Sequence, residues 1–205
     1  MNTKNLTRRL LCALSLSLGV LSMQATQAQD APKTAGAPQV KFVTNMGEFV
    51  VEVYPDKAPK TAENFLQYVR DKHYEGTIFH RVIANFMIQG GGYDARYIER
   101  PTRAPVMHEG LEALSKGGPR NTVGTIAMAR TNAPHSATAQ FFINVVDNGF
   151  LDPSPQQPGY TVFGKVVSGM DIVNRIRAIP TGFGGPFPSD VPRTPVVIKS
   201  ATVLP

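Results

Sequence analysis

Short apolar runs recur along residues 39–205, separated by glycine and polar residues. The first two, QVKFVTN (39–45) and EFVVEVY (48–54), flank Met46-Gly47 and indicate a β-hairpin. Later runs are of the same kind: TIFHRVI, FMIQGG, GTIAMAR, QFFINVV, YTVFGKVV and PVVIKSATVL. The pattern predicts about six to eight strands.

Two segments, 59–70 and 169–179, have apolar residues at helical spacing instead. Three apolar side chains share one side of each predicted helix: Phe65, Leu66 and Val69 in the first, and Ile172, Val173 and Ile176 in the second. Two helices among many strands, without regular βαβ alternation, predict an antiparallel barrel or sandwich with helices packed outside it.

The first 28 residues have the layout of a secretory signal peptide. Lys4, Arg8 and Arg9 supply positive charge without an acid, and the apolar stretch LLCALSLSLGVL follows. Thr26 and Ala28 are small residues at the −3 and −1 positions of a cleavage site. A membrane-spanning helix needs about 20 apolar residues, so the pattern favours a cleaved signal over an uncleaved anchor.

Removing residues 1–28 changes what the composition indicates. Three of the 21 Lys+Arg lie there, so 18 remain against 15 Asp+Glu and the net charge falls from +6 to +3. Such a small excess indicates no nucleic-acid partner. The only cysteine, Cys12, is lost too, so the mature chain would fold without disulfides. Residues 29–38 (QDAPKTAGAP) predict a flexible lead-in to one domain over 39–205.

The run FHRVIANFMIQGG carries Arg81 and Gln89 among residues suited to burial. Since side chains two apart on a strand share a face, Arg81 should point one way and His80 the other. If the chain bends at Ala84-Asn85, the strand face that carries Arg81 meets the strand face that carries Gln89. The two then form an apolar surface with two polar side chains, which is typical of a small-ligand or peptide site. The competing interpretation is a surface arginine whose stem covers apolar area while its head stays in water.

A second informative run is GTIAMARTNAPHSATAQFFINVVDNGFLD (124–152). The two runs together resemble the cyclophilin family of peptidyl-prolyl cis–trans isomerases, because FHRVI, FMIQGG, GTIAMAR, QFFIN, FLD and VFGKVVSGMDIV occur in the family's order and at compatible spacing. The resemblance extends over 39–205 and is greatest to the exported bacterial branch. It implies a mainly β fold, a closed eight-stranded antiparallel β-barrel capped by two α-helices.

The resemblance implies a catalytic role for Arg81. Rotation about a peptide C–N bond meets a barrier of about 18–20 kcal/mol, and a site lowers it by favouring the twisted state that has lost amide delocalisation. In the family, the arginine that matches Arg81 contacts the proline end of the substrate and stabilises the twisted imide, while Gln89 helps to hold arginine and substrate. This chemistry requires no nucleophile, general base, metal or cofactor.

The family pattern also assigns the substrate-binding residues. Those that would form or border the apolar pocket for the proline ring are Ile83, Phe86, Met87, Phe142, Phe150, Leu151 and Tyr160. Those that would line the groove for the residues preceding proline are Ala129, Arg130, Thr131 and Gln140.

Three of these residues depart from the pattern of many relatives. Arg130 stands where those relatives, chiefly eukaryotic ones, have asparagine, and Tyr160 stands where they have histidine. Phe150 stands where they have tryptophan, whose indole N–H donates to a carbonyl of cyclosporin, the family's cyclic-peptide inhibitor. Phenylalanine has no such donor, so weak binding of cyclosporin-type peptides is expected.

The four histidines form no HExxH motif or other paired metal spacing, and no metal site is expected. His80 is interpreted as a core histidine with satisfied hydrogen bonds. His108-Glu109 is interpreted as a turn or surface pair. The loops at 93–121 and 152–159 receive no site residue.

The sequence therefore predicts an exported isomerase that accelerates the folding of periplasmic proteins. Its partners would be Pro-containing unfolded or partly folded polypeptides, and it would act as a monomer without nucleic acid or stable membrane association after signal cleavage. One alternative is a chaperone or binding module that holds such segments without turnover, which Arg81 and Gln89 disfavour. The other is a barrel for a small apolar ligand, which the polar groove residues disfavour.

Overall fold

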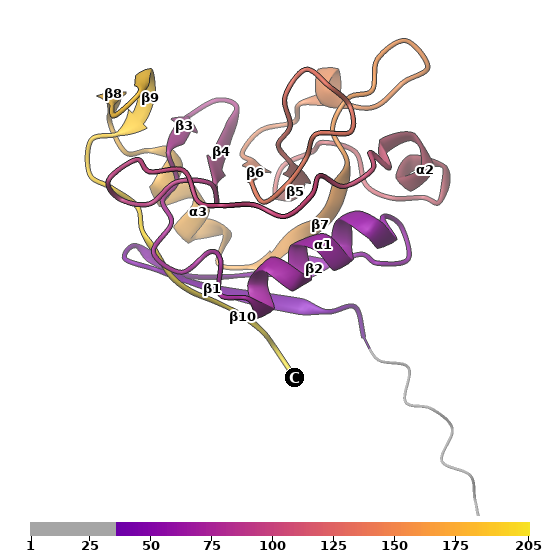
Figure 1. Cartoon of the computed structure of the whole chain (residues 1–205), viewed down its shortest axis with the longest axis horizontal. Coiled ribbons are helices and arrows are strands. Elements are labelled where there is room, and N and C mark those ends of the chain that lie inside the picture. Colours follow the sequence, from indigo (N-terminus) through magenta and orange to yellow (C-terminus); the bar gives the residue numbers. More distant parts are fainter. Residues whose placement is uncertain (1–35) are drawn as a thin grey trace, which may run out of the picture. The chain divides into compact units, whose positions relative to one another are not determined.

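The computed structural model describes residues 36–205 (Figure 1). The predicted signal peptide and all but the last three residues of the predicted lead-in lie outside the described residues. The elements are β1 (Gln39–Thr44), β2 (Gly47–Val53), α1 (Pro59–Arg70), β3 (Arg81–Ile83), β4 (Met87–Gly90), α2 (Gly110–Ser115), β5 (Thr125–Met128), β6 (Phe141–Asn144), the 3-10 turn η1 (Gly149–Leu151), β7 (Val162–Ser168), α3 (Met170–Arg177), β8 (Thr181–Gly184), β9 (Phe187–Pro192) and β10 (Ile198–Val203).

Eight strands form one sheet in the order β10-β1-β2-β7-β5-β6-β4-β3, and all its pairings are antiparallel. The predicted hairpin at Met46-Gly47 joins β1 to β2. Gly47 has φ 129°, a conformation that side chains with a Cβ rarely adopt. A Cβ there would also lie 2.6 Å from Ile172 Cδ1, so glycine lets α3 approach this turn.

The sheet is curled but open, which corrects the prediction of a closed barrel. Its edge strands β3 and β10 form no ladder with each other. The chain ahead of β3 meets the chain ahead of β10 at the isolated bridge Ile78–Val197, where Phe79 N donates to Val196 O at 3.0 Å. Closure fails because β3 is three residues long and begins only after this crossing.

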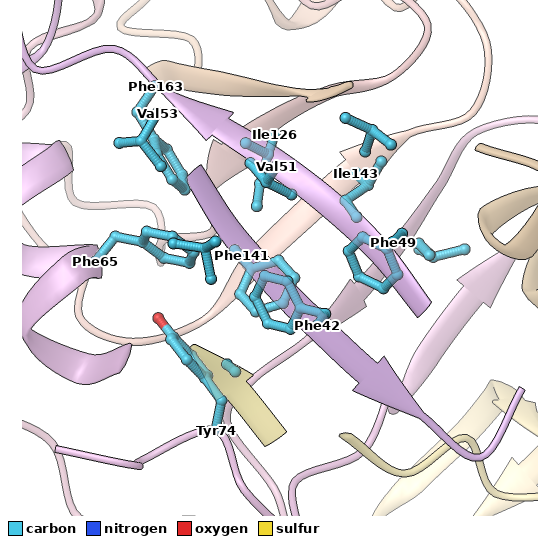
Figure 2. Close-up of a cluster of buried hydrophobic side chains, with 14 of the residues drawn as sticks. Phe42, Phe49, Val51, Val53, Phe65, Tyr74, Ile126, Phe141, Ile143 and Phe163 are labelled. Carbon is cyan, nitrogen blue, oxygen red and sulfur yellow. The ribbon is translucent and has the colours of Figure 1, made fainter. Parts of the chain in front are cut away.

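One face of the sheet carries the main core (Figure 2). Phe42 and Phe49 are cross-strand partners whose rings stack at 4.9 Å between centroids. Phe65 of α1 packs against Phe163 of β7 at 4.9 Å. Aromatic pairs of this kind bury large apolar areas and add about 0.5–1.5 kcal/mol beyond that burial.

Helices α1 and α3 confirm the two helices predicted from periodicity, and all six residues predicted for their inner faces are buried. Helix α2 and the β8–β9 hairpin were not predicted. Helix α2 has six residues, too few for a periodic pattern, and β8 and β9 contain glycines and prolines that are depleted in strands. Within residues 36–205, no helix has the length and hydropathy to cross a membrane.

Glu109 corrects the prediction of a turn or surface pair at His108-Glu109. Its side chain is buried, and its carboxylate accepts from Lys60 N at 3.1 Å, Thr61 N at 2.8 Å and Thr61 Oγ1 at 2.7 Å. Helix α1 has no side-chain cap of its own and no acid in its first turn. Glu109 therefore supplies from a distant loop the acceptors that the N-terminal amides of α1 need.

Candidate active site

Strand register brings the predicted catalytic residues into one row. Arg81 on β3 pairs with Gln89 on β4, Gln89 pairs with Phe142 on β6, and Phe142 pairs with Ala127 on β5. Because directly paired residues point to the same face, these side chains form a row across the sheet. The residues that alternate with them belong to the main core: Val82, Ile88, Ile143 and Ile126.

A second apolar cluster covers the face that carries this row. Its buried members are Met87, Ala127, Phe142 and Val162, and its partly buried members are Ile83, Phe86, Ala129, Leu151 and Tyr160. The Tyr160 ring stands edge-on to Phe142 at 5.4 Å between centroids. The Phe150 ring stacks on Phe86 at 5.7 Å. The cluster gives the site an apolar floor.

A cavity of about 380 Å³ lies over this floor. The predicted site residues that line it are Arg81, Phe86, Met87, Gln89, Ala129, Arg130, Gln140, Phe142, Leu151 and Tyr160. Three others do not line it. Ile83 packs against the apolar cluster, Thr131 lines a second cavity of about 170 Å³ that shares Gln89 and Gln140, and Phe150 is 66% exposed beside Phe86.

Arg81 keeps its hydrogen-bond donors free. Its Nε lies 3.8 Å from Asp190 Oδ2, and its Cζ lies 6.0 Å from the centre of the Phe86 ring. Gln89 Nε2 donates to Gln140 Oε1 at 2.9 Å rather than contacting the arginine. No side-chain hydrogen bond within residues 36–205 uses a guanidinium donor of Arg81, whose one charged neighbour within 4.0 Å is Asp190. Its guanidinium can therefore donate to a ligand in the cavity.

Arg130, in contrast, is fully engaged by the protein. Its Nε and Nη2 donate to Gly159 O at 2.9 and 2.8 Å, and its Nη1 donates to Thr131 O at 2.8 Å. Its Cζ lies 4.6 Å from the centre of the Tyr160 ring, within cation–π range. Arg130 therefore fixes Tyr160 and the adjoining loop as one wall of the cavity.

Three residues that line the cavity were not assigned from the sequence: His80, Tyr93 and Phe187. Their rings pack together, with centroid separations of 4.8 Å for His80–Tyr93, 5.2 Å for His80–Phe187 and 5.0 Å for Tyr93–Phe187. Tyr93 lies in a loop that received no assignment. Phe187 lies in GPFP, where the prolines hide the strand pattern of β9.

His80 is buried as predicted, but two other expectations for it are wrong. It lines the same cavity as Arg81 because the strand begins at Arg81, so strand alternation does not extend to residue 80. Its Nδ1 has no hydrogen-bond partner among residues 36–205, so it is not a satisfied core histidine. Burial, followed by the charge of Arg81, lowers the pKa of His80 to about 4.

The arrangement can bind an apolar ring and donate hydrogen bonds to the amide next to it. No group of three or more His, Cys, Asp or Glu that could hold a metal occurs in the described part of the chain. Residues 39–203 match the family model for cyclophilin type peptidyl-prolyl cis-trans isomerase/CLD. The chain belongs to this family.

Relatives of this cyclophilin include two bacterial enzymes. It is 52% identical over 167 residues to peptidyl-prolyl cis-trans isomerase B of Escherichia coli (strain K12), covering 80% of this chain and 98% of the relative. It is 42% identical over 199 residues to peptidyl-prolyl cis-trans isomerase A of Dickeya dadantii (strain 3937), covering 97% and 99%. With such relatives, this cyclophilin is a peptidyl-prolyl cis-trans isomerase.

Solved structures show the same fold. A cyclophilin type peptidyl-prolyl cis-trans isomerase of Cryptosporidium parvum is 25% identical with a TM-score of 0.65, covering 82% of this cyclophilin and 98% of that chain. A second structure of that protein, in the presence of the dipeptide Ala-Pro, is 24% identical with a TM-score of 0.64, covering 82% and 99%.

Proposed function

We propose that this cyclophilin accelerates the folding of exported proteins by isomerising X-Pro bonds, and that Arg81 stabilises the twisted imide. The observation that carries the mechanism is the position of Arg81, whose guanidinium donors are free of hydrogen bonds within residues 36–205, at the side of a cavity of about 380 Å³ with an apolar floor. A Pro-containing polypeptide is the substrate that uses both features.

The proline ring sits on the apolar floor, against Met87, Phe142 and Leu151. In the planar imide the nitrogen lone pair is delocalised and accepts no hydrogen bond. As the bond twists, the lone pair returns to nitrogen, and a donor placed beside it gains an interaction that the planar state lacks. The interaction lowers the barrier because it is stronger in the transition state than in the ground state.

Arginine suits this role because it stays charged and presents several donors in a rigid fork. Comparing X-Pro exchange in wild type and Arg81→Ala tests the mechanism. If the protein were a binding module without turnover, X-Pro exchange would take its unaided time of tens to hundreds of seconds with wild type and with Arg81→Ala alike. A receptor for a small apolar ligand would likewise leave the unaided exchange time unchanged.

The proposal of export depends on residues 1–28. Their charge, apolar stretch and small residues before Gln29 form the layout of a cleaved signal. The match to the Dickeya relative over 199 residues reaches into this N-terminal segment, which supports a shared leader. The proposal of export does not depend on the isomerase site.

Cleavage is expected after Ala28, so that the exported product begins at or near Gln29. Intact-mass measurement of protein recovered from the periplasm checks the cleavage position. Ala28→Arg is the matched control, because a charged side chain at −1 should block processing and leave the precursor. Export of a wild-type chain that retains residues 1–28 would contradict the proposal.

Cyclosporin sensitivity is expected to depend on Phe150. Its ring is 66% exposed and stacks on Phe86, so it offers apolar contact at the edge of the cavity without an N–H. Restoring an indole donor in Phe150→Trp adds one hydrogen bond worth about 0.5–1.5 kcal/mol, or about a two- to tenfold gain in cyclosporin affinity. Turnover of a short peptide should change less, because it depends on Arg81.

Titrating cyclosporin against wild type and Phe150→Trp measures this effect. Phe183→Trp is the control, since Phe183 is 86% exposed and does not line the cavity. Tight inhibition of the wild type, or an equal gain in both tryptophan variants, would mean that Phe150 does not determine sensitivity.

A further inference from the structure

The β8–β9 hairpin forms a separate two-stranded sheet whose strand β9 contacts β3. Phe187 stacks on His80 and stands edge-on to Tyr93. Val191 is buried, and Gly184 approaches it so closely that an added Cβ would lie 2.7 Å from Val191 Cγ1. The contacts of Phe187 anchor the hairpin beside the strand that carries Arg81, and the contact of Gly184 with Val191 holds its two strands together.

The hairpin places one acid at Arg81. Asp190 Oδ2 lies 3.8 Å from Arg81 Nε, and no other carboxylate in residues 36–205 lies within 4.0 Å of that guanidinium. Asp190 has φ 66°, a left-handed conformation that aspartate and asparagine tolerate better than most residues with a Cβ. The backbone at residue 190 therefore holds a carboxylate where a strand residue of ordinary φ would aim its side chain differently.

We propose that Asp190 is a positioning residue for catalysis, which holds the Nε edge of Arg81 so that its two Nη groups face the substrate imide. The inference depends on the proposed role of Arg81. A free arginine side chain samples many rotamers, so an acid that restricts it reduces the conformational freedom lost on reaching the transition state. The side chains are 44% and 35% exposed, so solvent screens the pair and its effect is modest.

Asp190→Asn separates charge from shape, because asparagine has nearly the same volume and tolerates the same φ. We expect kcat for a short X-Pro peptide to fall about two- to fivefold at low salt, with KM little changed. The difference from wild type should narrow toward 1 M salt, where the screening length falls to about 3 Å. Asp190→Gly, which removes the carboxylate and any backbone strain, should behave in the same way.

Asp71→Asn is the matched control. Asp71 pairs with Arg103 at similar exposure, 39% for the acid, and neither residue lines the active-site cavity. Removing the charge of Asp71 should leave both kcat and the salt dependence of kcat unchanged. A direct readout is the order parameter of the Arg81 Nε–Hε group by NMR, which should fall in Asp190→Asn and stay at the wild-type value in Asp71→Asn.

Several results would overturn the positioning role. Unchanged or raised kcat in Asp190→Asn would do so, as would an unchanged order parameter at Arg81. A loss as large as that in Arg81→Ala would also overturn it, because positioning supplies only part of what the guanidinium does. Near wild-type turnover in Arg81→Ala is a different outcome, since it refutes the proposed mechanism whatever Asp190 does.

Discussion

Replacing Arg81 with alanine is expected to lower kcat/KM for X-Pro isomerisation about 10²- to 10³-fold, the usual cost of removing one donor that acts at the transition state. The free energy of unfolding should change little, because the Arg81 guanidinium makes no hydrogen bond within residues 36–205 and the side chain is 44% exposed. Exchange measured by NMR on a short peptide gives the rate, and denaturant unfolding gives the stability.

Two further variants sharpen this test. Arg81→Lys keeps the charge but replaces the planar fork with a compact ammonium that lacks Nε, so it should restore only a small part of the lost rate. Arg96→Ala removes another arginine, paired with Asp94 and 78% exposed, and should leave the rate unchanged. If Arg81→Ala isomerises at near the wild-type rate, or Arg81→Lys restores it fully, a specific role for the guanidinium is wrong.

The local part of the site could be predicted from the sequence because strand alternation is a short-range rule. Arg81 and Gln89 share a face, and the structure pairs them directly. The aromatic and aliphatic residues of QFFIN divide between the two faces, so that Phe142 lies under the cavity and Phe141 lies in the main core. These assignments need only a period of two and the turn between β3 and β4.

The rest depended on contacts between distant parts of the chain, which no local pattern encodes. Asp190 and Phe187 reach the site from a hairpin whose glycines and prolines conceal it, and Glu109 reaches α1 from a loop. The open edge between β3 and β10 has the same origin. The segments before β3 and β10 cross at the Ile78–Val197 bridge, and a closed sheet would need β3 and β10 to pair beyond that point. Strand β3 offers only three residues for such pairing.

His80 is expected to make the protein acid-sensitive. Its pKa is lowered from 6.5 to about 4, so below pH 6.5 the unfolded chain binds a proton at this site more readily than the folded one. Stability from His80 is therefore fully present above pH 6.5 and is lost as the pH falls toward 4. With about 1.36 kcal/mol for each tenfold change in proton affinity, the free energy of unfolding should fall by roughly 3 kcal/mol from this group.

Denaturant unfolding of wild type and His80→Gln between pH 4 and pH 7 measures this contribution. Burial also lowers the pKa of His73 and His108, so these groups also make the free energy of unfolding of the wild type fall as the pH falls. His73 is less deeply buried than His80. His73→Gln should therefore reduce the pH dependence of the free energy of unfolding less than His80→Gln does. An equal slope in wild type and His80→Gln would contradict the expectation. NMR titration of the folded wild type gives an independent check, because the His80 ring should stay neutral until about pH 4.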